Sequence, residues 1–154
     1  MIFGVSPTKK AVVIAQATGT GATFTIKSIT SIAFQARSGD DLGDLLQRLV
    51  ARFDRRGASA RSTIALLASS SGRFKSSVEA IKAEAITELA AAESHLPVVK
   101  VTAASLKKAL GCATGQKWQA RAEERFNPTG RHKNWSQGAA GAVSAALKVA
   151  GESS

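Results

Sequence analysis

The sequence predicts an α/β domain in which a mixed, five-stranded β-sheet is flanked by helices. Three strand-like segments open the chain, and strand-like and helix-like segments alternate after them. At 154 residues the chain has the length of one ordinary domain, and no linker or internal repeat divides residues 1–154. We therefore expect a single domain whose sheet begins with antiparallel strands and continues through helical crossovers.

The opening segments read as three antiparallel strands. Residues 2–5 (IFGV) and 11–17 (AVVIAQA) flank the polar turn SPTKK, and together they predict a β-hairpin. In residues 23–34 (TFTIKSITSIAF), apolar residues alternate with polar neighbours, which predicts a third strand.

The clearest helix follows these strands. Asp40 and Asp41 stand in its expected first turn, where the helix dipole favours acidic residues. Apolar residues then repeat at three- and four-residue spacing as far as Phe53, which predicts one apolar face. Gly57 fits the C-terminal cap of this helix.

Two short apolar runs in the second half of the chain predict the remaining strands. Residues 62–70 (STIALLASS) suit a central strand covered on both faces, and residues 97–101 (PVVKV) suit another buried strand.

Helices are expected around these strands. Ser77 is a candidate cap for an alanine-rich helix over residues 78–93, and two further helices are expected over residues 102–111 and 136–150. The stretch 112–134 is polar, basic and punctuated by glycine, and no element is assigned to it.

The charge of the chain favours a polyanionic partner. Lys and Arg number 21 against 11 Asp and Glu, which gives a formal net charge of +10. Acidic residues are missing before Asp40, between Asp54 and Glu79, and between Glu124 and Glu152. Such an excess favours nucleic acid first, with acidic lipid or protein behind it, although a merely soluble basic surface would carry the same charge.

Several classes of protein and site are not expected. The apolar runs are too short to span a bilayer, and the opening MIFGVSPTKK lacks the basic-then-apolar order of a secretion signal, so we expect a cytoplasmic protein. Cys112 is the only cysteine, which excludes an internal disulfide and a cysteine-based zinc site. No His, Cys, Asp or Glu cluster has ligand spacing, so we expect neither a metal nor a cofactor.

The remaining titratable residues suggest no catalytic group. Glu79, Glu84 and Glu88 could form a substitute carboxylate cluster, but a solvated helix face is the interpretation that we favour. His95 is expected in a turn, and His132 in a polar contact, because no carboxylate orients it as a base.

The segment from Lys100 to Lys133 carries eight basic residues and two acidic ones, with Trp118, Phe126 and Trp135 in and beside it. Basic side chains neutralise phosphates, and aromatic rings can stack on unpaired bases. For the aromatic residues we favour packing of the last helices onto the sheet. For the charges we favour polyanion binding.

The order of the elements resembles that of RNase H-like folds, and local stretches resemble more narrowly the RuvC-type Holliday-junction resolvases. That family opens with apolar-Gly-Ile-Asp-Pro-Gly and a second strand, where this chain has IFGVSP and AVVIA. An apolar strand ending in Glu, a loop, a small-residue helix and a strand follow. Their places are taken by IALLASS, SGRFKSS, EAIKAEAITELAAAE and PVVKV.

The later motifs of the family are matched in the same order. A Val-Lys-Lys-like helix ending in Gly corresponds to TAASLKKALG (residues 102–111). A last helix reading Asp-Ala-Ala-Asp-Ala corresponds to GAAGAVSAALKVA (residues 138–150). The resemblance covers most of the chain and implies a RuvC-type, RNase H-like domain.

The resemblance also implies a nuclease site whose carboxylates are replaced. In the family, carboxylates of the first strand, the fourth strand and the last helix hold two metal ions that cleave a phosphodiester. By position, Ser6 replaces the first Asp, Ser69 or Ser70 the Glu, and Gly138 and Gly141 the two helix Asp residues. Mg²⁺ prefers anionic oxygen ligands, so we expect no metal site and no cleavage, with these positions converging at one end of the central strands.

Two functions from different classes remain open. The first is a RuvC-like domain that binds DNA or RNA without cleaving it, mainly through phosphates. The second is a structural or regulatory subunit that binds an acidic protein partner, and either function is compatible with a homodimer. A metal-dependent nuclease is the minority alternative. The residues expected to contact nucleic acid are Arg73, Lys75, Lys107, Lys108, Lys117 and Arg131.

Overall fold

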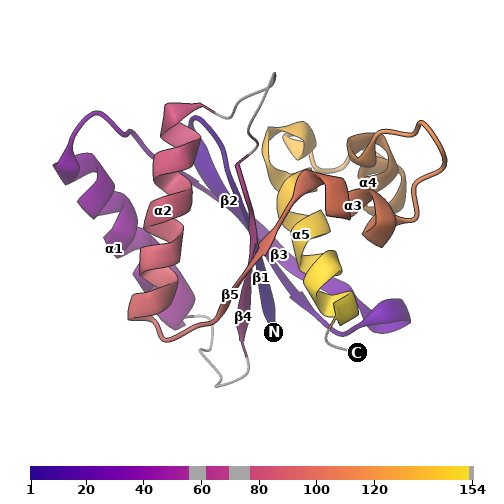
Figure 1. Cartoon of the computed structure of the whole chain (residues 1–154), viewed down its shortest axis with the longest axis horizontal. Helices are drawn as coiled ribbons and strands as arrows, with labels where there is room; N and C mark the ends of the chain where they lie inside the picture. Colours follow the sequence, from indigo (N-terminus) through magenta and orange to yellow (C-terminus); the bar gives the residue numbers. More distant parts are fainter. Residues whose placement is uncertain (56–61, 70–76, 153–154) are drawn as a thin grey trace.

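A computed structural model describes residues 1–55, 62–69 and 77–152 and shows the predicted α/β fold. A five-stranded sheet has the strand order β3-β2-β1-β4-β5. Helices cover both of its faces, with α1 and α2 on one side and α3, α4 and α5 on the other (Figure 1). The strands are β1 (Ile2–Pro7), β2 (Ala11–Thr18), β3 (Thr25–Ala33), β4 (Thr63–Leu67) and β5 (Val98–Val101).

Five α-helices and two 3₁₀ turns lie in the described ranges. The helices are α1 (Gly39–Arg55), α2 (Val78–Glu93), α3 (Ala103–Leu110), α4 (Trp118–Phe126) and α5 (Ala139–Glu152), and the turns are η1 (Gly21–Thr23) and η2 (Trp135–Gln137). None of the helices in this part of the chain is both long enough and apolar enough to cross a membrane.

The strand pairing confirms the predicted mixed sheet. Strand β1 pairs antiparallel with β2, which pairs antiparallel with β3. Strand β1 also pairs parallel with β4, and β4 with β5. Because β1, β4 and β5 run in the same direction, their carboxyl ends meet at one edge of the sheet, where functional side chains of such sheets usually gather.

The helix caps agree with the sequence. The Ser77 side chain accepts a hydrogen bond from the Ala80 backbone N–H at 3.1 Å, as expected for the start of α2. Gly111 ends α3 in the left-handed conformation with φ of 70°. The predicted cap Gly57 lies outside the described residues.

The face covered by α1 and α2 has a core of large side chains. Leu45, Leu49 and Phe53 on α1 are fully buried, and the Phe53 ring lies 5.5 Å from the ring of Phe3 on β1. This packing accounts for the three- and four-residue spacing in the sequence of α1.

The opposite face is covered by α5, most of whose residues are small and buried. At Gly4, in the middle of β1, an added Cβ would overlap the backbone carbonyl of Ala142 on α5. The helix backbone therefore lies directly against the strand, which requires glycine at position 4.

Two sequence predictions are wrong in detail. Strand β5 is not buried: it is an edge strand that pairs with β4 alone, and Val99 on it is 37% exposed. Its short apolar run cannot be distinguished by pattern from a central strand. The stretch 112–134 contains a helix, α4, which buries Ala122 and packs Trp118 and Phe126 against the α5 side of the core.

Candidate functional site

Strands β1 and β4 and helix α5 meet in direct contact at the carboxyl end of the sheet. Ser6, near the end of β1, is 5% exposed. Leu67 ends β4, and Gly141 lies in the first turn of α5. A Cβ added at Gly141 would lie 2.8 Å from Ser6 Oγ and 2.8 Å from Leu67 Cδ2. The structure thus brings Ser6 and Gly141 together and fills the space between them.

Gly138 precedes α5 and lies over the neighbouring strand β2. Its φ of 119° is a conformation that favours glycine, and an added Cβ would lie 2.6 Å from Val13 Cγ2. Val13 is the register partner of Ser6 in the β1–β2 pair, so Gly138 also lies at this edge of the sheet. Neither glycine leaves room for a longer side chain without movement of its neighbours.

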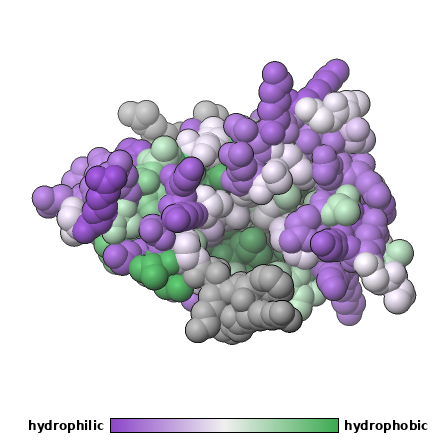
Figure 2. Space-filling model, turned by 90° about the horizontal axis from the view of Figure 1, so that it is seen from above, coloured by the Kyte–Doolittle hydropathy of each residue, from purple (hydrophilic) through white to green (hydrophobic). Residues whose placement is uncertain are grey.

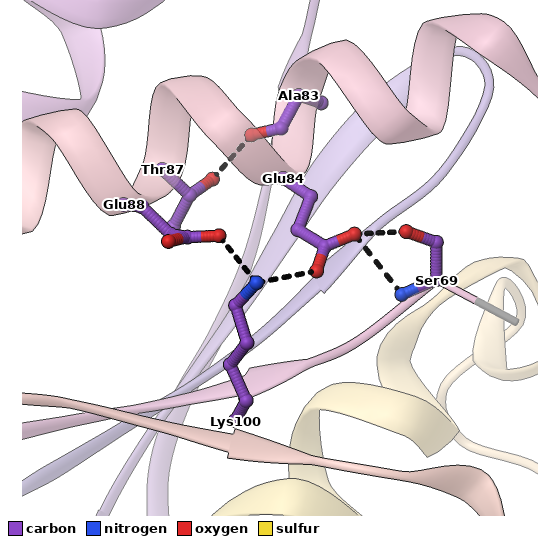
Figure 3. A network of polar contacts seen from close by, with 6 residues as sticks. All are labelled: Ser69, Ala83, Glu84, Thr87, Glu88 and Lys100. Carbon is purple, nitrogen blue, oxygen red and sulfur yellow. Dashed lines mark hydrogen bonds and ion pairs between the residues drawn. The ribbon is translucent and has the colours of Figure 1, made fainter.

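Ser69, which follows β4, contacts helix α2 instead of α5. Its backbone N–H donates to Glu84 Oε2 at 3.0 Å, and its hydroxyl donates to the same oxygen (Figure 3). Ser70 lies outside the described residues. Ser69 and Pro7 line a hollow of about 230 Å³ together with Glu84 and Trp118.

Glu84 corrects the prediction of a solvated helix face on α2. It is 7% exposed, and Lys100 Nζ on β5 lies 3.4 Å from Glu84 Oε1 and 2.7 Å from Glu88 Oε1 (Figure 3). Helix α2 is apolar around most of its circumference, so the sequence did not reveal which face meets the sheet. The partners on β4 and β5 are distant in sequence and carry no local pattern.

This polar network changes the ionisation of its lysine. The hydrogen bond from Lys100 to Glu88 raises the pKa of the ammonium group above the ordinary value of 10.5, and the charges of Glu88 and Glu84 add to this. Desolvation acts in the opposite direction and is outweighed. The ion pairs therefore favour the charged lysine.

A larger groove of about 940 Å³ opens beside the contact between Ser6 and Gly141. Apolar side chains lie along it, among them Val13, Ile29 and Leu67. Figure 2 looks onto this end of the molecule, where the surface is hollowed, with hydrophobic residues at the base and hydrophilic residues around it. Among the residues that the structure describes, three lysines line the groove: Lys9, Lys10 and Lys117.

The aromatic residues pack as the sequence predicts. Trp135 is 5% exposed in the core under α5, and the Phe126 ring lies 5.9 Å from the ring of Phe24. Trp118 is half-buried and lines both the groove and the smaller hollow. His132 lies against Trp135 with ring centroids 6.2 Å apart.

The predicted nucleic-acid contacts are spread over this side of the molecule. Lys117 lines the groove. Lys107 and Lys108, in the last turn of α3, and Arg131 are exposed, but none of the three lines the groove or the smaller hollow. Arg73 and Lys75 lie outside the described residues.

Two groove residues, Lys9 and Lys10, were not predicted from the sequence. They form the turn of the β1–β2 hairpin, three and four residues after Ser6, and both are exposed. Their closeness in sequence to Ser6 was the signal that could have identified them. A hairpin turn directly follows the end of its first strand, so its residues lie at the same end of the sheet as Ser6.

Within residues 1–55, 62–69 and 77–152, no group of three or more His, Cys, Asp and Glu residues could hold a metal ion. Glu84 lines the smaller hollow and Glu123 the groove. Glu84 already accepts from Ser69 and pairs with Lys100.

Comparison with known proteins identifies the fold. No family model matches the chain, and no match was found among curated proteins. A structure of Thermus thermophilus RuvC matches with a TM-score of 0.70 and 16% identity, over 96% of this chain and 91% of that one. Thermus thermophilus RuvC in complex with a Holliday junction substrate matches with a TM-score of 0.69 and 15% identity, over 96% and 90%. The chain has the RNase H-like fold of RuvC, as the sequence predicts.

Proposed function

We propose that this protein is a RuvC-like domain that binds nucleic acid, DNA or RNA, without cleaving it. One observation carries the proposal: where β1, β4 and α5 meet, Ser6 packs against Gly141, and the adjoining groove carries lysines. The structural likeness to RuvC bound to a Holliday junction supports a nucleic-acid ligand.

The geometry argues against two-metal cleavage. Such cleavage needs two cations held between carboxylates that approach from several elements. Ser6 offers a neutral hydroxyl, and Gly138 and Gly141 offer no side chain. Glu84 comes from α2 and is bound to Ser69 and Lys100, so it cannot replace a set of converging ligands.

The positive charge supplies the binding energy in this proposal. With a net charge of +10, the protein attracts polyanions, and contacts to phosphates are largely independent of sequence. Lys107, Lys108, Lys117 and Arg131 are exposed cations of the described chain and are available for such contacts. Arg73 and Lys75 belong to the same proposal on the sequence alone.

Two assays on the purified protein test the proposal. With Mg²⁺ or Mn²⁺ present, we expect no cleavage of single-stranded, duplex or branched DNA or of RNA. Binding should weaken as salt rises, with a log–log slope of about −0.7 to −0.9 per phosphate neutralised. Neutralising Lys107 and Lys108 together should weaken binding to all sequences similarly. It should also make the log–log salt slope less steep, by the amount expected for about two phosphate contacts.

A control on the other face of the sheet and two contrary outcomes complete the test. Lys82→Gln removes one positive charge from α2, on the other face of the sheet, and should change binding little. Metal-dependent cleavage that disappears in Glu84→Gln would establish the nuclease alternative. Failure to bind any nucleic acid at low salt would contradict the proposal and favour an acidic protein partner.

A further inference from the structure

The groove beside Ser6 combines two chemically different surfaces. Its walls include Val13, Ile29 and Leu67, while Lys9, Lys10 and Lys117 bring positive charge to it. Ala139 and Ala140 at the N-terminus of α5 also line it, and the helix dipole there favours negative charge. A ligand that fits both surfaces must present an apolar face and an anionic group together.

Trp118 gives the groove a stacking surface. This residue starts α4 and lines both the groove and the smaller hollow that holds Ser69 and Glu84. Because the indole of Trp118 is half-buried, its position is fixed by packing while part of it stays accessible. A preformed aromatic surface in a groove is how proteins bind bases without reading their sequence.

The groove also contains donors and acceptors that the protein does not satisfy. In the described part of the chain, Trp135 Nε1 and His132 Nδ1 are buried and have no hydrogen-bond partner. Both residues line the groove, and an indole N–H can only donate. Buried polar atoms are normally paired, so these two nitrogens would gain a partner if a water molecule or a ligand atom reached them from the groove.

We propose that the groove takes an unpaired stretch of nucleic acid, with a base against Trp118 and phosphates at Lys9, Lys10 and Lys117. This inference rests on the proposed function and adds which form of nucleic acid the groove prefers. In a duplex the base faces are already stacked, so the apolar walls would stay uncovered. An unpaired base exposes an apolar face beside its own phosphate, as the two surfaces of the groove require.

The test compares three probes of equal length: a single-stranded DNA, the duplex of the same sequence, and the single strand with its bases removed at internal positions. At one salt concentration the single strand should bind most tightly. Trp118→Leu, which keeps an apolar side chain but removes the ring, should weaken single-strand binding roughly 5- to 150-fold. The same change should leave binding of the abasic strand nearly unaltered, and Trp118→Phe should restore most of the affinity.

The lysines of the hairpin turn need a different readout. The double variant Lys9→Gln, Lys10→Gln should weaken binding of the normal and abasic strands equally, and it should flatten the salt slope by about 0.7 for each phosphate that is no longer neutralised. Lys82→Gln, which removes one positive charge from the opposite face, is the control. Thermal unfolding of every variant separates a loss of binding from a loss of fold.

The two proposals fail in different ways. If no probe binds at low salt, the proposed function itself is wrong. If the probes bind but the duplex equals or exceeds the single strand, the inference about the groove is wrong and the proposed function stands. An equal effect of Trp118→Leu on binding of the normal and abasic strands would also overturn the inference, because the contribution of the indole ring would then not depend on stacking with a nucleobase.

Discussion

The two faces of the sheet are packed by opposite means. On the face covered by α1 and α2, large side chains such as Leu49 and Phe53 fill the space between helix and strand. On the face covered by α5, alanine and glycine let the helix backbone touch the sheet at Gly4 and Gly141. On the first face, large side chains hold the helices away from the sheet. On the second face, small residues let the backbone of α5 lie directly against the sheet.

This difference bears on function. A site that holds ligands between a helix and a strand needs side chains of some length pointing into that space. At the contact between Gly141 and Ser6 the space is already filled by the strand side chains. The accessible chemistry therefore lies beside this contact, in the groove with Lys9, Lys10 and Lys117.

The largest expected effect is on the tight face. Gly4→Ala places a Cβ on the backbone carbonyl of Ala142, which cannot move without shifting α5. We expect the free energy of unfolding to fall by more than about 3 kcal/mol, the upper end of the usual cost of overpacking. Urea unfolding of the variant measures this.

Gly43→Ala is the matched control on the other face. Gly43 lies inside α1, and an added Cβ would meet nothing within 4 Å. Alanine there should raise stability by about 0.5–1 kcal/mol, because glycine is a poor helix former. Similar effects of the two changes would contradict the contrast between the faces.

A smaller loss of stability is expected at Gly141, where an added side chain would meet the ends of other side chains and not the backbone. In Gly141→Asp the new Cβ meets Ser6 Oγ and Leu67 Cδ2, which can both rotate. We expect the free energy of unfolding to fall by about 1–3 kcal/mol, measured by urea unfolding.

The same variant tests metal binding. Because one carboxylate at position 141 has no converging partners, Mg²⁺ should not raise the melting temperature of Gly141→Asp. A clear rise with Mg²⁺ would show that a binding site forms there.

The polar network on the other face should respond less strongly. In Glu84→Gln the amide oxygen can still accept from Ser69, but the ion pair with Lys100 is removed. We expect a loss of about 1–2 kcal/mol, as for a weakened buried hydrogen bond. Glu79→Gln, in the first turn of the same helix, is the control and should cost less. Equal losses would place Glu84 among ordinary surface residues, against its burial.

The sequence was sufficient for the order and type of most elements. The hairpin at Ser6, the apolar stripe of α1 and the cap at Ser77 are local patterns, and each is confirmed. Helix α4 was missed because its stabilisation comes from packing of Trp118 and Phe126 against distant residues.

The candidate site was only partly predictable for the same reason. Ser6 and Gly141 could be placed together through the resemblance to RuvC-type proteins, and the structure brings them into contact. Local pattern does not show that Glu84 turns inward to Ser69 and Lys100, because the three residues come from separate elements. Their roles, and those of the predicted phosphate contacts, stay predictions that the binding and stability assays test.

The smallest expected effect concerns pH and Lys100. Its pKa is raised above 10.5, first by the hydrogen bond to Glu88, so the folded state holds this proton more tightly than the unfolded state does. The resulting stabilisation is complete below the pKa of an unfolded lysine and is lost as pH rises through the higher folded pKa. Because the side chain is 51% exposed, the contribution should be less than about 1 kcal/mol and should shrink in high salt. Urea unfolding of the wild type and Lys100→Met should therefore differ at neutral pH and converge above pH 10.5. Lys27→Met, at an exposed position of β3, is the control that removes a lysine outside this network. A difference that stayed constant across this range would mean that Lys100 acts through packing of its aliphatic chain and not through its charge.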